Sequence, residues 1–201
     1  HRRLTPGDES RPFYETGITN MSFEMRQQNS GHLTRAHYGS ACLPGPGDFL
    51  FIILGTGDGQ IEDQCRMLER NFGPHVRSLI MYNEGVAHRL YAAADFLWMP
   101  SRTEPCGLNQ MYAMRYGTVP IARATGGLLD TIEPFDGIEG DGFLFRELED
   151  YQGMWGIESG SRLYSMPELH SKVREKIMHK DLSWEHSASR YLDIFHEIIP
   201  A

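Results

Sequence analysis

The 201 residues of this chain are enough to bury one sizeable hydrophobic core, so we expect one large domain or a domain with an appendage. A formal net charge of -8, from 27 acidic and 19 basic residues, gives no electrostatic case for binding nucleic acid or an anionic membrane. No apolar run approaches the ~20 residues that span a bilayer, and the three cysteines show neither CxxC spacing nor a disulfide pattern, which favours a reducing compartment.

The first 47 residues form a poorly patterned start. They hold polar and Gly/Pro-rich pieces such as LTPGDES and LPGPGD, with one possible helix around Met21 to Gln28. The sequence starts at His1 with no initiator Met and no signal-peptide pattern, so we interpret it as a fragment.

Residues 48–180 alternate between strand and helix patterns. The run FLFIILG from Phe49 is typical of a buried parallel strand, and the following GQIEDQCRMLERNF has apolar residues at helical spacing. The alternation continues through VRSLIMY, EGVAHRLYAAA, DFLWMP, a helix opened by Gly107 and closed by Gly117, TVPIARA, GGLLDTI and a possible last strand GFLFRE. This order predicts an α/β fold with a Rossmann-like, doubly wound parallel sheet.

The last third of the chain is expected to be mainly helical after one loop. QGMWGIESGS is rich in Gly and Ser and is interpreted as that loop, whereas MPELHSKVREKIMH has apolar residues in helical register. Residues 181–201 are interpreted as a final helix around SASRYLDIFHEII.

One strand-to-helix connection carries chemically suggestive residues. Glu104 leaves the sheet at the carboxyl end of the strand Asp95 to Pro100, where open α/β sheets bind ligands. The backbone N–H groups of Gly107, Leu108 and Asn109 would lie at the start of the next helix, which favours an anion such as a diphosphate. A carboxylate just upstream could then face the group that the diphosphate carries, which suggests a nucleotide-linked donor with an uncharged group such as a sugar.

The sequence EPCGLNQMYAMRYGTVPI, with TGGLLDT after it and LGTGD before it, resembles the carboxyl-terminal half of ADP-glucose-dependent glycogen and starch synthases. These are retaining glycosyltransferases with two Rossmann-like domains, the GT-B architecture. The resemblance runs from about Phe49 to Phe145 and resumes over residues 181–195. It implies transfer of glucose from ADP-glucose to the non-reducing end of an α-1,4-glucan, with this chain as the donor-binding half.

The resemblance also implies a setting for the activity. EPCGLNQMY favours a bacterial glycogen synthase in the cytoplasm over a plastid starch synthase. No cofactor or metal is implied, and no HExxH, DxD or CxxC pattern suggests one. The glucan acceptor would bind through a missing amino-terminal domain, which the final helix would brace.

Several site residues follow from the resemblance, each beside a simpler interpretation. Glu104 would face the donor glucose and stabilise charge in the transition state, or be a solvated loop carboxylate. Tyr82 would stack on adenine, or be an ordinary strand-end aromatic residue. Cys106 would lie beside the donor, or be a small buried residue with no nucleophilic role. Gly107, Leu108 and Asn109 would contact the diphosphate.

Further donor contacts would come from two more motifs. Thr125, Gly126 and Gly127 match the family's TGGL turn, although any strand-to-helix turn could use two glycines. SRPFYETGI aligns loosely with the family's SRLxxQKGI, so Arg11 would neutralise the diphosphate while Thr16 replaces the family lysine.

Two other functions compete with this interpretation. A degenerate module that binds nucleotide or glucan without catalysis is favoured by Thr16 and by Ala124, which replaces a second family cation. A nicotinamide-dependent dehydrogenase is disfavoured, because no GxGxxG follows a first strand. His88 and Arg89 have no metal-ligand spacing and are interpreted as a solvated face or a cleft-edge pair.

Overall fold

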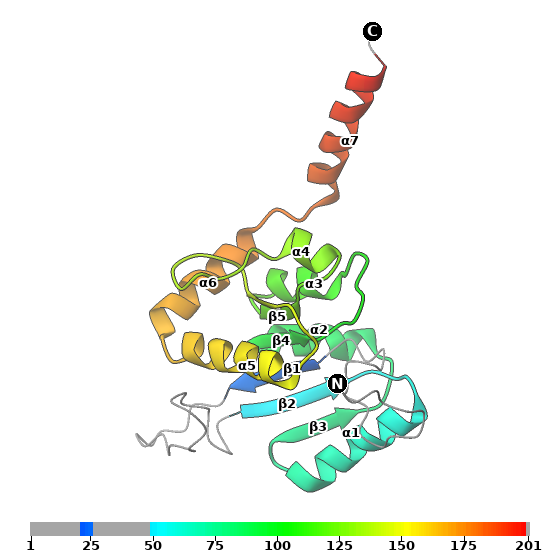
Figure 1. The fold of residues 1–201 in the computed structure, drawn as a ribbon, viewed down its shortest axis with the longest axis vertical. Helices are drawn as coiled ribbons and strands as arrows, with labels where there is room; N and C mark the ends of the chain where they lie inside the picture. The colour runs from blue at the N-terminus through cyan, green and yellow to red at the C-terminus, as the bar shows by residue number, and fades with distance from the viewer. Residues whose placement is uncertain (1–20, 26–48, 200–201) are drawn as a thin grey trace.

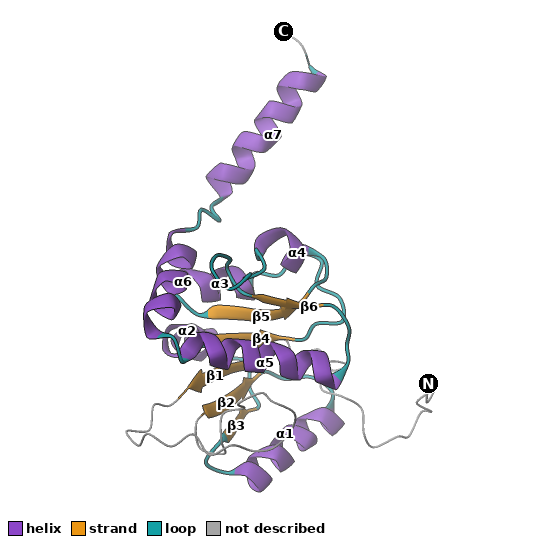
Figure 2. Cartoon of the chain, turned by 60° about the vertical axis from the view of Figure 1, so that its left-hand side comes forward, coloured by secondary structure: helices purple, strands orange, loops and turns teal. Residues whose placement is uncertain are grey.

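The computed structural model describes residues 21–25 and 49–199. They form a six-stranded sheet in the order β3-β2-β1-β4-β5-β6, with helices on both of its faces (Figures 1 and 2). The strands are β1 Met21–Met25, β2 Phe49–Leu54, β3 Val76–Leu79, β4 Phe96–Met99, β5 Val119–Arg123 and β6 Phe143–Phe145. The helices are α1 Gly59–Phe72, α2 Glu84–Ala93, α3 Asn109–Arg115, α4 Gly127–Thr131, α5 Asp150–Tyr164, α6 Pro167–His179 and α7 Trp184–Ile198. The α/β class expected from the sequence is confirmed.

Strand β1 corrects the expectation of a helix around Met21 to Gln28. It lies between β2 and β4 and pairs antiparallel with both, whereas β2–β3, β4–β5 and β5–β6 are parallel. The sequence MSFEM alternates apolar and polar residues, which is a strand period that a five-residue run expresses only weakly. Its pairing with two longer-range neighbours decides the conformation, because both of their edges need backbone hydrogen-bond partners.

Successive residues of β4 and β5 contribute to two separate hydrophobic clusters, one on each face of the sheet. Phe96 and Ile121 face α5 and α6, where they pack with Leu163 and Val173 among others. The alternate residues of the same strands, such as Leu97, pack on the other face with residues of α2, α3 and α4. This period of two along each strand is what lets one sheet bury both faces.

Helix α5 corrects a second expectation, because the Gly/Ser-rich segment QGMWGIESGS is helical and not a loop. Its glycines face the sheet at helical spacing. A Cβ atom on Gly156 would lie 2.7 Å from Ile121 Cγ2, and one on Gly153 would lie 3.0 Å from Trp98 Cη2. The glycines therefore allow the helix to approach the sheet closely, and this packing outweighs their low helix propensity.

Helix α7 lies within residues 181–201, where the sequence predicts the final helix. It projects away from the rest of the domain (Figures 1 and 2). It begins at a Ser183 cap whose hydroxyl accepts a hydrogen bond from His186 N at 3.3 Å. None of its residues is buried. Among the described residues, no helix is both long enough and apolar enough to cross a membrane.

Candidate functional site

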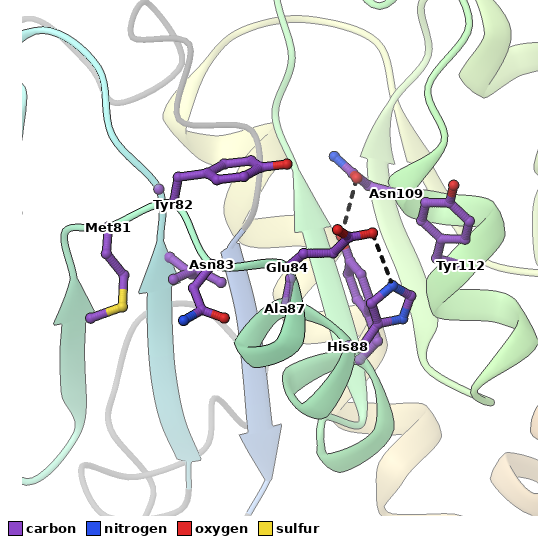
Figure 3. Close-up of a pocket in the computed structure, with 11 residues that line it drawn as sticks. Met81, Tyr82, Asn83, Glu84, Ala87, His88, Asn109 and Tyr112 are labelled. Atoms are coloured by element: carbon purple, nitrogen blue, oxygen red, sulfur yellow. Dashed lines mark hydrogen bonds and ion pairs between the residues drawn. The ribbon is translucent and has the colours of Figure 1, made fainter.

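A pocket of about 280 Å³ lies where β2 and β3 end, at the carboxyl edge of the sheet (Figure 3). Four segments surround it: the end of β2, the connection from β3 into α2, helix α2 itself, and α3. Its lining residues are Leu54, Gly55, Met81, Tyr82, Asn83, Glu84, Ala87, His88, Tyr91, Asn109 and Tyr112. Ligands of open α/β sheets bind at this edge, so the pocket is the first candidate for a binding site.

Tyr82 forms one wall of this pocket and leaves its ring largely free. Strand β3 ends at Leu79, earlier than the sequence pattern indicates, so Tyr82 belongs to the connection and is 87% exposed. The next residue, Asn83, caps α2 by accepting a hydrogen bond from Val86 N at 3.0 Å. The capped helix fixes the backbone beside Tyr82, while the exposed ring can stack on a flat ligand.

The opposite side of the pocket is an aromatic group around His88 (Figure 3). The His88 ring centroid lies 5.7 Å from that of Tyr112 and 6.1 Å from that of Tyr91, and its Nε2 is 3.9 Å from a Glu84 carboxylate oxygen. His88 is thus at the edge of the pocket, one of the two positions considered from the sequence. Glu84 and Tyr112 were missed as pocket residues, although the i, i+4 spacing of Glu84 and His88 was a usable signal.

Tyr91 links helix α2 to the start of α3. Its hydroxyl donates to Asn109 Oδ1 at 3.1 Å. Burial, with a smaller contribution from Tyr112, raises the pKa of Tyr91 to about 12, so the hydroxyl keeps its proton at neutral pH. This bond holds the Asn109 side chain at the edge of the pocket.

Glu104 lies in the loop that follows β4 and is half-buried. Its Oε2 accepts a hydrogen bond from Ser101 Oγ at 3.4 Å. The loop is held from the side of β5 by Arg123, whose Nη1 donates to Arg102 O at 2.6 Å. Arg123 therefore braces the loop that carries Glu104.

The helix after Glu104 begins two residues later than the sequence predicts, at Asn109 and not at Gly107. Gly107 has a φ of 72°, a left-handed conformation that favours glycine, and α3 begins only at Asn109, after Leu108 as its cap. Cys106 is exposed, so the interpretation as a small buried residue is wrong.

The Thr125-Gly126-Gly127 turn lies directly against this loop. Gly127 N donates to Glu104 O at 3.0 Å. Cβ atoms on Gly126 and Gly127 would lie 2.0 Å from Glu104 O and from Cys106 O, respectively. The two glycines are therefore required by the close approach of two backbone segments.

The structure thus brings the expected residues together in two adjoining groups. Tyr82 and Asn109 line the pocket, while Glu104 and Cys106 lie in the loop that contacts the glycine turn. Residues 107 and 108 join the two groups, because they connect that loop to α3. Arg11 and Thr16 lie outside the described residues.

No metal site accompanies these groups in the part of the chain that the structure describes. There, no cluster of three or more His, Cys, Asp or Glu residues could hold a metal ion.

The chain has similar sequences and structures among known proteins. It is 38% identical over 154 residues to a glycogen synthase of Desulfitobacterium hafniense, covering 75% of this chain and 33% of that protein. It is 41% identical over 152 residues to a glycogen synthase of Myxococcus xanthus, covering 76% and 31%. The catalytic domain of starch synthase IV from Arabidopsis thaliana bound to ADP and acarbose is 35% identical, with a TM-score of 0.65 over 73% of this chain and 31% of that one.

These comparisons confirm the resemblance noted in the sequence and the Rossmann-like fold of a GT-B glycosyltransferase domain. The chain spans about a third of the length of the curated relatives it matches. Residues 46–158, more than half of the chain, match the family model for glycosyl transferases group 1. The chain belongs to this family of glycosyl transferases.

Proposed function

We propose that this chain is the donor-binding half of a glycosyltransferase that moves glucose from ADP-glucose to the non-reducing end of an α-1,4-glucan with retention. The observation that carries the proposal is that the pocket beside Tyr82 adjoins the loop of Glu104 at one edge of the sheet. The glycogen synthases among its relatives, and the starch synthase structure bound to ADP and acarbose, support this substrate class.

In this proposal the adenine occupies the pocket and stacks on the exposed ring of Tyr82. Base stacking on an aromatic side chain contributes about 1–3 kcal/mol. Asn109 and Glu84 supply polar atoms at the same pocket, which a base and ribose can use for hydrogen bonds.

The diphosphate and glucose would then extend from the pocket toward the loop. The backbone of Gly107, Leu108 and Asn109 would contact the diphosphate. Thr125 and Gly126 would approach it from the adjoining turn. Gly127 would contribute chiefly by letting the loop lie close, because its N–H already donates to Glu104 O. Arg11, from the amino-terminal segment, would add a positive charge.

Glu104 would face the glucose, and Cys106 would border it. A preorganised polar group aimed at charge that develops in the transition state typically lowers the activation free energy by ~3–4 kcal/mol. The proposal assigns no metal or cofactor to the donor site.

Helix α7 would complete the enzyme by packing on an amino-terminal domain that binds the glucan. Its exposed apolar side chains support this role: Trp184, Tyr191, Leu192, Ile194, Phe195 and Ile198. The acceptor would meet the donor between the two domains.

Calorimetric titration of this chain with ADP and NAD tests the donor assignment. We expect weak ADP binding, because Thr16 replaces a cation, and no heat from NAD. Tyr82→Ala should weaken ADP binding by about 1–3 kcal/mol. Glu104→Ala is the matched control, which should leave ADP affinity unchanged since the carboxylate would face the sugar. Binding of NAD without a response to ADP would overturn the proposal.

A further inference from the structure

Gln110 has a fully buried side chain directly beneath the loop that carries Glu104 and Cys106. Its Nε2 donates to Gly107 O at 2.8 Å, to Thr131 Oγ1 at 3.0 Å and to Cys106 O at 3.2 Å. An amide nitrogen has two hydrogens, so these three acceptors share them. Burying an amide is costly unless its hydrogen bonds are made, and the bonds that Nε2 donates all serve the loop and α4, whereas Oε1 has no hydrogen-bond partner among the described residues.

Thr131 extends this contact to the glycine turn. Its hydroxyl donates to Gly127 O at 2.6 Å and accepts from Gln110, so the single hydroxyl hydrogen is used once. Gly127 N in turn donates to Glu104 O at 3.0 Å. Gln110 and Thr131 therefore close a ring of hydrogen bonds around the segment from Glu104 to Gly107. We call this ring of hydrogen bonds the clamp.

The orientation of the Gln110 amide is fixed by its surroundings. Turning the amide over would place its oxygen against two carbonyl oxygens and a hydroxyl whose hydrogen is already donated elsewhere. In the observed orientation, a Cβ atom on Gly107 would lie 2.5 Å from Gln110 Oε1. The left-handed glycine and the buried amide are thus fitted to each other.

We propose that Gln110 and Thr131 are positioning residues, which hold the loop so that Glu104 faces the glucose of the donor. Neither side chain lines the pocket, so both act through the loop. This inference rests on the proposed function and adds two residues that set the sugar end of the site.

Amide exchange provides a test that needs no ligand. Gln110→Met keeps the side-chain length but removes the donors, and Thr131→Val removes the hydroxyl. Both variants should lose protection of the Gly127 N–H, measured by NMR, while Thr131→Ser should keep it. Thr118→Val is the matched control: Thr118 is also fully buried and donates to Tyr91 O and Ala94 O, beside the start of β5 at the opposite sheet edge. It should lower the unfolding temperature without changing exchange at Gly127.

A comparison of the affinities for AMP and for ADP-glucose then separates a positioning role from a structural one. AMP would occupy the pocket alone, whereas ADP-glucose would also contact the loop. In Gln110→Met and Thr131→Val, affinity for ADP-glucose should fall by about tenfold more than affinity for AMP, the loss expected of about 1.4 kcal/mol in loop contacts. Thr131→Ser and Thr118→Val should keep the wild-type ratio.

The outcomes can be told apart. Retained protection at Gly127, or equal losses for both ligands, would overturn the positioning role. If Gln110→Met does not fold, the Thr131→Val and Thr131→Ser pair decides alone. If the unmodified chain binds neither ligand, the proposed function fails, and the inferred role in donor positioning fails with it, while exchange at Gly127 still reports on the clamp.

Discussion

Buried polar residues serve distinct purposes in this domain. Gln110 and Thr118 direct all their donor groups to backbone or side-chain oxygens. Asp141, with a side chain only 1% exposed, accepts from Lys180 and lies 3.5 Å from Lys176 Nζ. Three buried side-chain atoms have no hydrogen-bond partner within the described residues: Gln110 Oε1, Asp141 Oδ1 and His170 Nε2.

His170 should make stability depend on pH. Its ring stacks on Phe96 at 5.6 Å, and burial, with a smaller effect of Arg174, lowers the pKa of His170 from 6.5 to about 4. Between these values the unfolded chain binds the extra proton and the folded chain does not. Stability therefore rises with pH in this window and falls by about 1.4 kcal/mol per pH unit below 6.5.

Urea unfolding at pH 7.5, 6.5 and 5.5 measures this effect. His170→Phe should flatten the dependence, since Phe stays uncharged against Phe96. His179→Gln, an exposed position on the same helix, is the control and should keep the wild-type slope. Equal slopes in His170→Phe and wild type would mean that other groups dominate the titration.

Among the elements, local patterns predicted α1 well but failed for α5 and β1. Ile61 and Cys65 have helical spacing within one local segment, and α1 has the expected bounds. The glycines of α5 make sense only against Trp98 and Ile121, which are distant in the sequence. A sequence pattern cannot show which side chains such glycines will meet.

The residues of the candidate site also fall into those that the sequence predicted and those that depend on distant contacts. The strand-end rule and the family resemblance brought out Tyr82 and Glu104, and the structure has both at the expected edge. Gln110 was not singled out, because a polar residue in a helix usually faces water. Its role depends on Thr131, which comes from another helix.

Close packing of α5 gives a prediction that opposes helix propensity. Gly156→Ala should gain up to ~1 kcal/mol in propensity, yet its Cβ would lie 2.7 Å from the fully buried Ile121. We expect a net loss of about 1–3 kcal/mol in the free energy of unfolding. Gly85→Ala in α2 is the control, because the nearest atom would be Asn83 Oδ1 at 3.5 Å, and it should stabilise. Urea denaturation compares them, and stabilisation by both would refute close packing of α5.

For the whole molecule, tertiary contacts weaken abruptly between α6 and α7. Lys180 Nζ donates to Thr131 O at 2.9 Å and to the buried carboxylate of Asp141, which ties the end of α6 to the sheet domain. Beyond it, α7 buries no residue and extends away from the domain. The apolar area on α7 therefore adds little to the stability of this chain.

Removal of residues 184–201 should consequently leave the free energy of unfolding within ~0.5 kcal/mol of the full chain, as for surface changes without tertiary contacts. Lys180→Met is the contrasting change, since it leaves Asp141 buried with a weaker partner, and it should cost about 2 kcal/mol or more. Thermal and urea unfolding measure both, and ADP titration should give the same affinity with and without α7. A large loss of stability on removing α7 would show that the helix packs against this domain, and its apolar side chains would then be unavailable to a second domain.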